Sequence, residues 1–134
     1  MELSSRMDGN EFRVLVCGGR SYEDRSRVFH VLDKALRAAT LAERPFVLIH
    51  GGAKGADALS GVWAAMREES VEERVYPADW EAHGRSAGPI RNRLMLTDGQ
   101  PHVIVAFPGG NGTADMIRQG KKAGVPVYEV KRGK

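Results

Sequence analysis

Three short apolar runs along the chain each stop at a glycine or a proline. They cover residues 13–17, 46–50 and 103–107. Apolar runs of this length without polar alternation are typical of strands that are covered on both faces, as in parallel sheets. Weaker runs at residues 71–76 and 125–130 predict two further strands.

The intervals between these runs carry apolar residues at helical spacing. One helix follows the capping-box pattern that starts at Ser21, and a second carries apolar residues from Ala58 to Met66. A third starts near Pro89, after a polar loop over residues 78–88, and a fourth covers about Thr113 to Ala123. Strands that alternate with helices predict an α/β domain with a parallel sheet.

Two strands have features of sheet edges. Pro126 cannot donate a hydrogen bond to a neighbouring strand, so the last strand is expected at one edge. The charged third strand, with Glu72 and Arg74, suits the other edge. Right-handed crossovers then predict a Rossmann-like, doubly wound open parallel sheet of about five strands in the order 3-2-1-4-5, with helices on both faces.

Length and composition fit one domain. The chain has 134 residues, for which we expect a disordered arm at 1–11, a single domain at 12–130 and a basic tail at 131–134. The lone Cys17 excludes an intrachain disulfide and favours a reducing, cytoplasmic compartment. No apolar run approaches the length of a membrane span, and no cluster has metal-ligand spacing. The net charge of +3 leaves nucleic-acid binding open without favouring it.

Glycine-rich loops follow the strands on both sides of the predicted switch point, where ligands bind in open α/β sheets. Glycines let backbone N–H groups surround an anion, and a helix N-terminus adds partial positive charge. Two such loops favour phosphate binding over a plain tight turn. Their candidate ligand-binding residues are Gly18, Gly19, Arg20, Ser21, Pro108, Gly109, Gly110, Asn111, Gly112 and Thr113.

Two further segments carry candidates with two readings each. After the second strand, Gly51 and Gly52 precede Lys54 and Asp57, which either contact phosphate and ribose or lie in solvent and cap a helix. Arg91 either holds a phosphate or lies on a solvated helix face. His50 and His83 are candidate acid–base groups, although histidines more often have a structural role. Trp80 is a candidate to stack on a nucleotide base, and Trp63 is expected in the core. No loop has the spacing of a Walker A or a dinucleotide-binding motif, so we expect no redox cofactor.

Taken together, these loops resemble a known family. The segments HGGAKGAD at 50–57, YPADW at 76–80, GPIRNRLM at 88–95 and FPGGNGTADM at 107–116 are similar to the YspA-type, YpsA-related branch of the SLOG superfamily. The similarity covers roughly residues 12 to 130. It implies a Rossmann-like fold that binds nucleotides or nucleotide-derived ligands, and for this branch it implies no settled reaction.

The same superfamily contains the LOG phosphoribohydrolases and the DNA-processing protein A, and the chain departs from the LOG pattern at one position. The LOG glutamate of Pro-Gly-Gly-x-Gly-Thr-x-x-Glu is replaced by Met116, with Asp115 one residue earlier. The resemblance makes Arg91 and Asp115 the catalytic candidates of any hydrolase. We therefore expect a binding module or sensor, with a phosphoribohydrolase-like enzyme and a single-stranded nucleic-acid binder as alternatives. Analogy with LOG proteins also implies a homo-oligomer.

Overall fold

The computed structural model describes residues 10–132. Residues 1–9 of the predicted arm, and residues 133–134 of the predicted tail, lie outside this part of the chain. Glu11, the last residue of the predicted arm, is buried, and its carboxylate pairs with Arg13 and Arg74 at 3.4 Å and 3.0 Å. Glu11 is therefore part of the folded domain and not of an arm.

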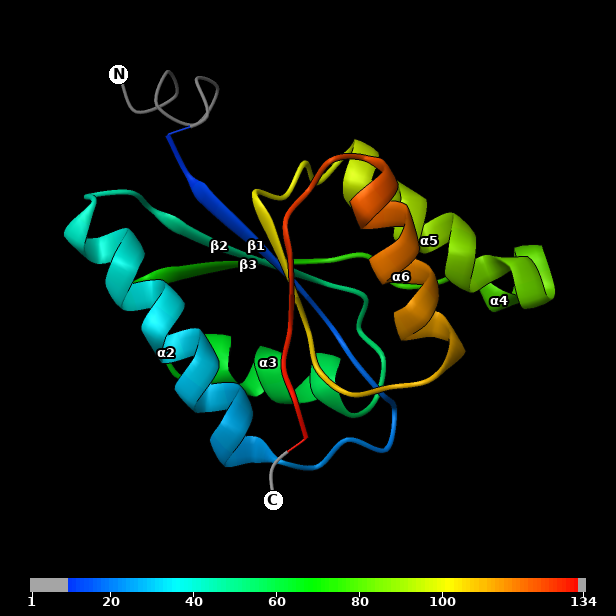
Figure 1. The fold of residues 1–134 in the computed structure, drawn as a ribbon, viewed down its shortest axis with the longest axis horizontal. Helices are drawn as coiled ribbons and strands as arrows, with labels where there is room; N and C mark the ends of the chain where they lie inside the picture. The colour runs from blue at the N-terminus through cyan, green and yellow to red at the C-terminus, as the bar shows by residue number, and fades with distance from the viewer. Residues whose placement is uncertain (1–9, 133–134) are drawn as a thin grey trace.

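A five-stranded parallel sheet forms the centre of the molecule (Figure 1). Its strands are β1 (Phe12–Cys17), β2 (Phe46–His50), β3 (Val71–Val75), β4 (Val103–Ala106) and β5 (Val127–Glu129). All neighbours pair in parallel, in the order β3-β2-β1-β4-β5, which confirms the predicted topology and both edges. Pro126 immediately precedes β5, and its carbonyl accepts a hydrogen bond from the Ile104 amide at 2.9 Å.

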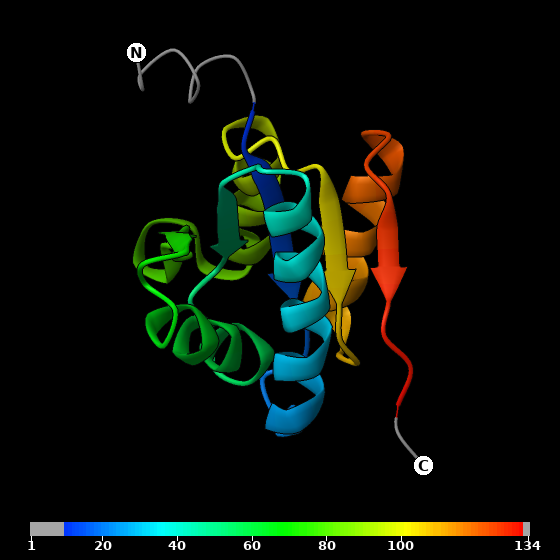
Figure 2. The same ribbon diagram turned by 90° about the vertical axis from the view of Figure 1, so that its left-hand side faces the viewer.

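Two helices cover each face of the sheet. The helix α2 (Arg25–Leu41) and the helix α3 (Ala56–Ala65) lie on one face, and α5 (Ala87–Thr97) and α6 (Asn111–Lys122) lie on the other (Figures 1 and 2). Alternate residues of β1 divide between the two layers: Val14 and Val16 pack under α2 and α3, while Leu15 and Cys17 pack under α5 and α6. Trp63 is fully buried in the first layer, as expected.

Local structure differs from the sequence-based expectation in two places. The predicted polar loop at 78–88 contains the short helix α4 (Trp80–His83) and the 3-10 turn η1 (Gly84–Ser86), and α4 begins where the Asp79 carboxylate accepts a hydrogen bond from the Ala82 amide. The N-cap of α2 is Asp24, which accepts a hydrogen bond from the Arg27 amide at 3.0 Å, so the cap lies three residues after Ser21, the first residue of the predicted capping box. None of the helices in residues 10–132 is long and apolar enough to cross a membrane.

Candidate functional site

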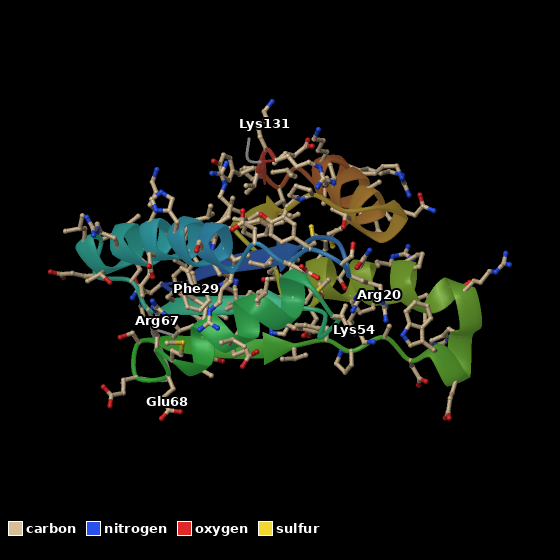
Figure 3. The ribbon with its side chains drawn as sticks, turned by 90° about the horizontal axis from the view of Figure 1, so that it is seen from below. Arg20, Phe29, Lys54, Arg67, Glu68 and Lys131 are labelled. Carbon is tan, nitrogen blue, oxygen red and sulfur yellow. The ribbon has the colours of Figure 1, made fainter. Side chains whose placement is uncertain are left out.

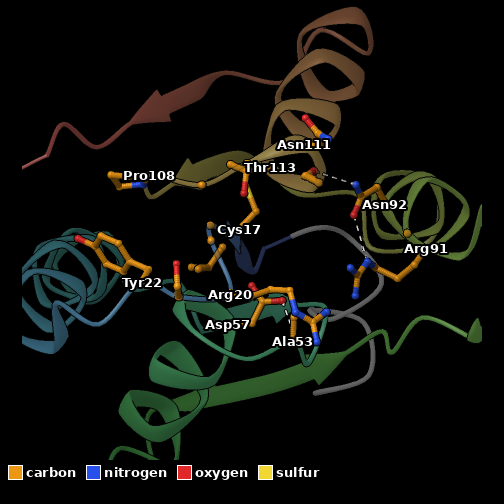
Figure 4. A pocket seen from close by; sticks show the side chains of 18 of the residues that line it. Cys17, Arg20, Tyr22, Ala53, Asp57, Arg91, Asn92, Pro108, Asn111 and Thr113 are labelled. Carbon is orange, nitrogen blue, oxygen red and sulfur yellow. Dashed lines mark hydrogen bonds between the residues drawn. The ribbon is translucent and has the colours of Figure 1, made fainter. Parts of the chain in front are cut away.

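A pocket of about 520 Å³ lies at the carboxyl ends of the central strands (Figure 4). This volume is within the range of small-molecule sites. Twelve of the fifteen residues predicted to contact a phosphate or sugar line it: Gly18, Gly19, Arg20, Ser21, Asp57, Arg91, Pro108, Gly109, Gly110, Asn111, Gly112 and Thr113. The switch point between β1 and β4 is therefore hollow, as the topology requires of a ligand crevice.

Three loops meet at Gly19, which fixes the shape of the pocket floor. The Gly19 amide donates to the Pro108 carbonyl at 2.9 Å, and the Gly19 carbonyl accepts from the Ala56 amide at 3.1 Å. A Cβ atom on Gly55 would lie 2.0 Å from the Gly19 carbonyl oxygen, and Gly55 has a φ of +80°. Because a side chain fits neither this contact nor this conformation, glycine is required where the two loops cross.

The N-terminus of α6 presents unpaired donors to the pocket. Its N-cap is Gly110, without a side-chain hydrogen bond, and the first helical bond runs from the Ala114 amide to the Gly110 carbonyl at 3.0 Å. Among residues 10–132, no acceptor is found for the amides of Asn111, Gly112 and Thr113. These three N–H groups and the helix dipole form a site suited to an anion.

Thr113 adds a hydroxyl to this helix N-terminus. The residue is 7% exposed and lines the pocket, and its Oγ1 has no hydrogen-bond partner in the described part of the chain. A Cβ atom on Gly109 would lie 2.2 Å from that oxygen, so Gly109 keeps the hydroxyl accessible by having no side chain. The hydroxyl is accessible from the pocket and has no partner within residues 10–132, so it is a candidate donor to a bound ligand.

Arg91 is held at the side of the pocket by three hydrogen bonds. Its Nη1 donates to the carbonyls of Gly51 at 2.7 Å and Tyr76 at 3.3 Å, and its Nε donates to Asn92 Oδ1 at 3.1 Å. Burial lowers the pKa of Arg91, Asp57 partly offsets this, and Arg20 lowers it further. An arginine remains charged under such shifts, so Arg91 places a fixed cation in the pocket wall.

Asn92, which the sequence analysis did not select, joins this arginine to the α6 loop. It is buried, and its Nδ2 donates to the Gly112 carbonyl at 3.3 Å and to Asp115 Oδ2 at 2.9 Å. One amide side chain therefore contacts both the cation and the first turn of α6 (Figure 4). The only sequence signal for this role of Asn92 is its place next to Arg91 early in a predicted helix. That signal does not reveal which turn of the chain the amide contacts.

Replacing Asn92 with alanine is expected to destabilise the protein by about 2 kcal/mol, because it removes the hydrogen bonds of this buried amide to Arg91, Gly112 and Asp115. The measurement is urea unfolding, with Arg93→Ala as the matched control on the exposed side of the same helix. A loss below about 0.5 kcal/mol would show that the bridge does not hold the α6 loop to Arg91.

Asp115 lies outside the pocket lining, unlike the other catalytic candidate, Arg91. Its carboxylate accepts from Asn92 and Gln119, at 2.9 Å and 2.8 Å, and pairs with Arg118. These partners tie α5 to α6 and occupy both carboxylate oxygens. Asp115 therefore stabilises the helix pair rather than facing a ligand.

Asp57 is the one carboxylate in the described pocket lining. Its Oδ2 accepts from the amides of Gly51 at 3.1 Å and Ala53 at 3.2 Å, and burial raises its pKa. It therefore organises the loop before α3 instead of capping that helix, whose N-cap is Gly55. Within the same loop, Ala53 lines the pocket whereas Gly51, Gly52 and Lys54 do not.

Of the histidine and tryptophan candidates for the site, Trp80 lines the pocket and the two histidines do not. His50 is buried, where its ring bonds Glu73 Oε2 at 2.6 Å and accepts from the Gly52 amide at 3.0 Å, so its role is structural. His83 is exposed outside the pocket lining. Trp80 lines the pocket and is 53% exposed, so it stays a candidate to stack on a ligand ring. Residues 10–132 contain no group of side chains placed to hold a metal ion.

Cys17 lines the pocket floor and is expected to be chemically inert. Burial, with a smaller contribution from Asp57, raises the pKa of its thiol to about 12. At pH 8 the thiolate fraction is then on the order of a thousandfold below that of an ordinary cysteine. We expect a disulfide reagent to react about a thousandfold faster with the protein unfolded in guanidinium than with the folded protein. If the two reaction rates differ by less than about tenfold, the thiol is not buried as described.

Comparisons with known proteins agree with this architecture. Residues 12–83 match the sequence profile of the YspA, cpYpsA-related SLOG family. The chain is 41% identical over 120 residues to the Gene 61 protein of Mycobacterium phage D29, which covers 86% of this chain and 93% of that protein. The X-ray structure of TM1055, a structural genomics target, is similar with a TM-score of 0.59 at 25% identity, covering 87% of this chain and 72% of the other.

Proposed function

Since this chain belongs to the YspA, cpYpsA-related SLOG family, we propose that it binds a nucleotide or nucleotide-derived phosphate as a sensor or binding module. The observation that carries the proposal is the first turn of α6. Three unpaired amides and the unpaired Thr113 hydroxyl face a pocket that also contains Arg20 and Arg91. A phosphate monoester supplies the acceptor oxygens and the negative charge that this arrangement lacks.

A thermal-shift panel of AMP, GMP, CMP and UMP against the matching nucleosides tests this proposal. A ligand that binds only the folded protein raises the midpoint of thermal unfolding. We expect at least one nucleotide to raise it, and the corresponding nucleoside at the same concentration to have a much smaller effect. Equal shifts for a nucleotide and its nucleoside, or no shift for any nucleotide, would overturn the proposal.

A phosphoribohydrolase-like enzyme is the second candidate, and Asp57 is the observation that favours it. This carboxylate shares the pocket with Arg91, and its raised pKa is a feature of catalytic carboxyl groups. The LOG-type position is occupied by Met116, which is fully buried in the apolar layer under α5 and α6. Chromatography that detects free base released from nucleoside monophosphates decides between binding and hydrolysis. We expect no release of free base.

We also expect the chain to self-associate through α5. Ile90 and Leu94 are 44% and 49% exposed on the outer side of this helix, next to the exposed Trp80. Burying such side chains against a second copy removes apolar surface from water. Light scattering is expected to give a dimer mass that falls to the monomer mass in Leu94→Glu, and a monomer for the unchanged protein would contradict this.

A further inference from the structure

The end of the β5 strand brings a third arginine to the pocket. The Val130 amide donates to the Ala106 carbonyl at 2.8 Å, and Arg27 Nη2 donates to the Lys131 carbonyl at 3.3 Å. The register pairs Glu129 with Ala106 at the carboxyl end of the sheet, and Arg132 follows three residues later. Arg132, which the sequence analysis assigned to a tail, accordingly lines the pocket.

Tyr22 lies on the same side of the pocket as Arg132. Its ring packs against Phe107 with a centroid distance of 5.4 Å, and it lines the pocket. Burial raises the pKa of its hydroxyl, while the nearby Arg27 and Arg132 act in the opposite direction. The hydroxyl therefore stays protonated near neutral pH and has no hydrogen-bond partner among residues 10–132, so it is free to donate.

The other two pocket arginines lie on the opposite side. Figure 4 shows Arg20 beside Arg91, with Tyr22 across the pocket and Thr113 between them. The proximity of Arg20 is also one cause of the lowered pKa of Arg91. We expect a single phosphate on the α6 amides to pair with Arg20 and Arg91, which would leave Arg132 and the Tyr22 hydroxyl on the far side without an anion.

We propose that the ligand is a nucleoside diphosphate or an ester of one, with one phosphate on the α6 amides and the second held by Arg132 and Tyr22. This inference rests on the proposed function, because it assigns a second subsite to the same pocket. The pocket lining contains three arginines and one aspartate, Asp57, and the cations stand on both sides of the helix N-terminus. Two linked phosphates give the cations on both sides an anion, whereas one phosphate with a neutral extension gives Arg132 none.

Inorganic phosphate and pyrophosphate are the probes for the test, because the base is unidentified and they need none. Their dissociation constants are measured at equal ionic strength for the unchanged protein, for Arg132→Gln and for Lys131→Gln. Lys131→Gln is the matched control, because it removes the same charge from an exposed residue outside the pocket lining whose side chain points outward (Figure 3). AMP and ADP are then compared in the same three proteins.

We expect pyrophosphate to bind roughly tenfold more tightly than phosphate, and this preference to fall to about twofold in Arg132→Gln but not in Lys131→Gln. The phosphate affinity is expected to stay within about twofold in both variants. If AMP and phosphate bind while Arg132→Gln leaves the affinities for pyrophosphate and ADP unchanged, this inference is wrong and the proposed function stands. If none of the four probes binds, both are wrong.

Discussion

Replacing Gly110 with valine is expected to weaken nucleotide binding by on the order of a hundredfold, about 2.7 kcal/mol, while the fold is retained. A Cβ atom at Gly110 would meet no atom within 4 Å, because it would point into open space at the start of α6. A branched side chain there occupies the volume in which the amides of α6 would hold a phosphate. The affinity is measured by calorimetry with the nucleotide that stabilises the unchanged protein most in the thermal-shift panel.

The matched control for this variant is Ala114→Val. It adds valine to the first turns of the same helix, at an exposed residue outside the pocket lining. We expect its affinity to remain within about twofold of the unchanged protein, and both variants to unfold within about 1 kcal/mol of it. Gly110→Val binding within threefold of the unchanged protein would place the phosphate elsewhere in the pocket.

Glutamate in place of Met116 is expected to cost about 4 kcal/mol of unfolding free energy at pH 7. Met116 is fully buried in a cluster with Leu15, Met95 and Ile104, and a carboxyl group in such surroundings has a strongly raised pKa. Holding a glutamate protonated at pH 7 costs about 1.4 kcal/mol for each pH unit above its ordinary value near 4.3. The penalty therefore shrinks as the pH falls toward that value and grows as it rises.

Denaturant unfolding at pH 5 and pH 7 measures this effect. Met116→Gln is the control without a charge, so its penalty is expected to be the same at both pH values, and Met116→Leu is expected to cost less than about 1.5 kcal/mol. We also expect Met116→Glu to release no base from nucleoside monophosphates, because residue 116 does not line the pocket. A Met116→Glu protein as stable as the unchanged one at pH 7 would show that this position is polar or wet.

The sheet topology was predictable from the sequence because local signals and chain-connection rules point to the same answer. The buried runs ending at Gly18, Gly51 and Pro108 are strands covered on both faces, and Pro126 marks an edge. The helices α4 and η1 were not predicted, because the single large apolar residue Trp80 and the polar or small residues after it carry no apolar periodicity. Their only local signal is the capping carboxylate of Asp79, which also suits a turn.

The only pocket residues that the sequence predicted well are those in loops that directly follow strands. Gly18, Gly110 and Thr113 line it because a switch point brings the ends of β1 and β4 together. Tyr22 and Arg132 were missed, since their positions depend on how α2 and the end of β5 pack against the same loop. No sequence spacing encodes that contact.

In the second glycine loop, the sequence predicted more ligand-binding residues than the pocket lining contains. Gly51 and Gly52 follow a strand as the other glycines do, yet they line no part of the pocket. A Cβ atom on Gly51 would lie 2.0 Å from Arg91 Nη1, so this glycine makes room for a guanidinium that binds its carbonyl. The same residue type serves ligand access in one loop and internal packing in the other.

Amide chemical shifts of the glycines test the central claim most directly. In protein labelled with ¹⁵N at glycine, titration with the best-binding nucleoside monophosphate is expected to move the signals of Gly110 and Gly112 most, with smaller changes at Gly18 and Gly19 and none at Gly84 or Gly124. The matching nucleoside, which lacks the phosphate, is expected to leave Gly110 and Gly112 in place. Large shifts confined to glycines outside the pocket, or equal shifts at Gly110 with the nucleoside, would contradict phosphate binding at the start of α6.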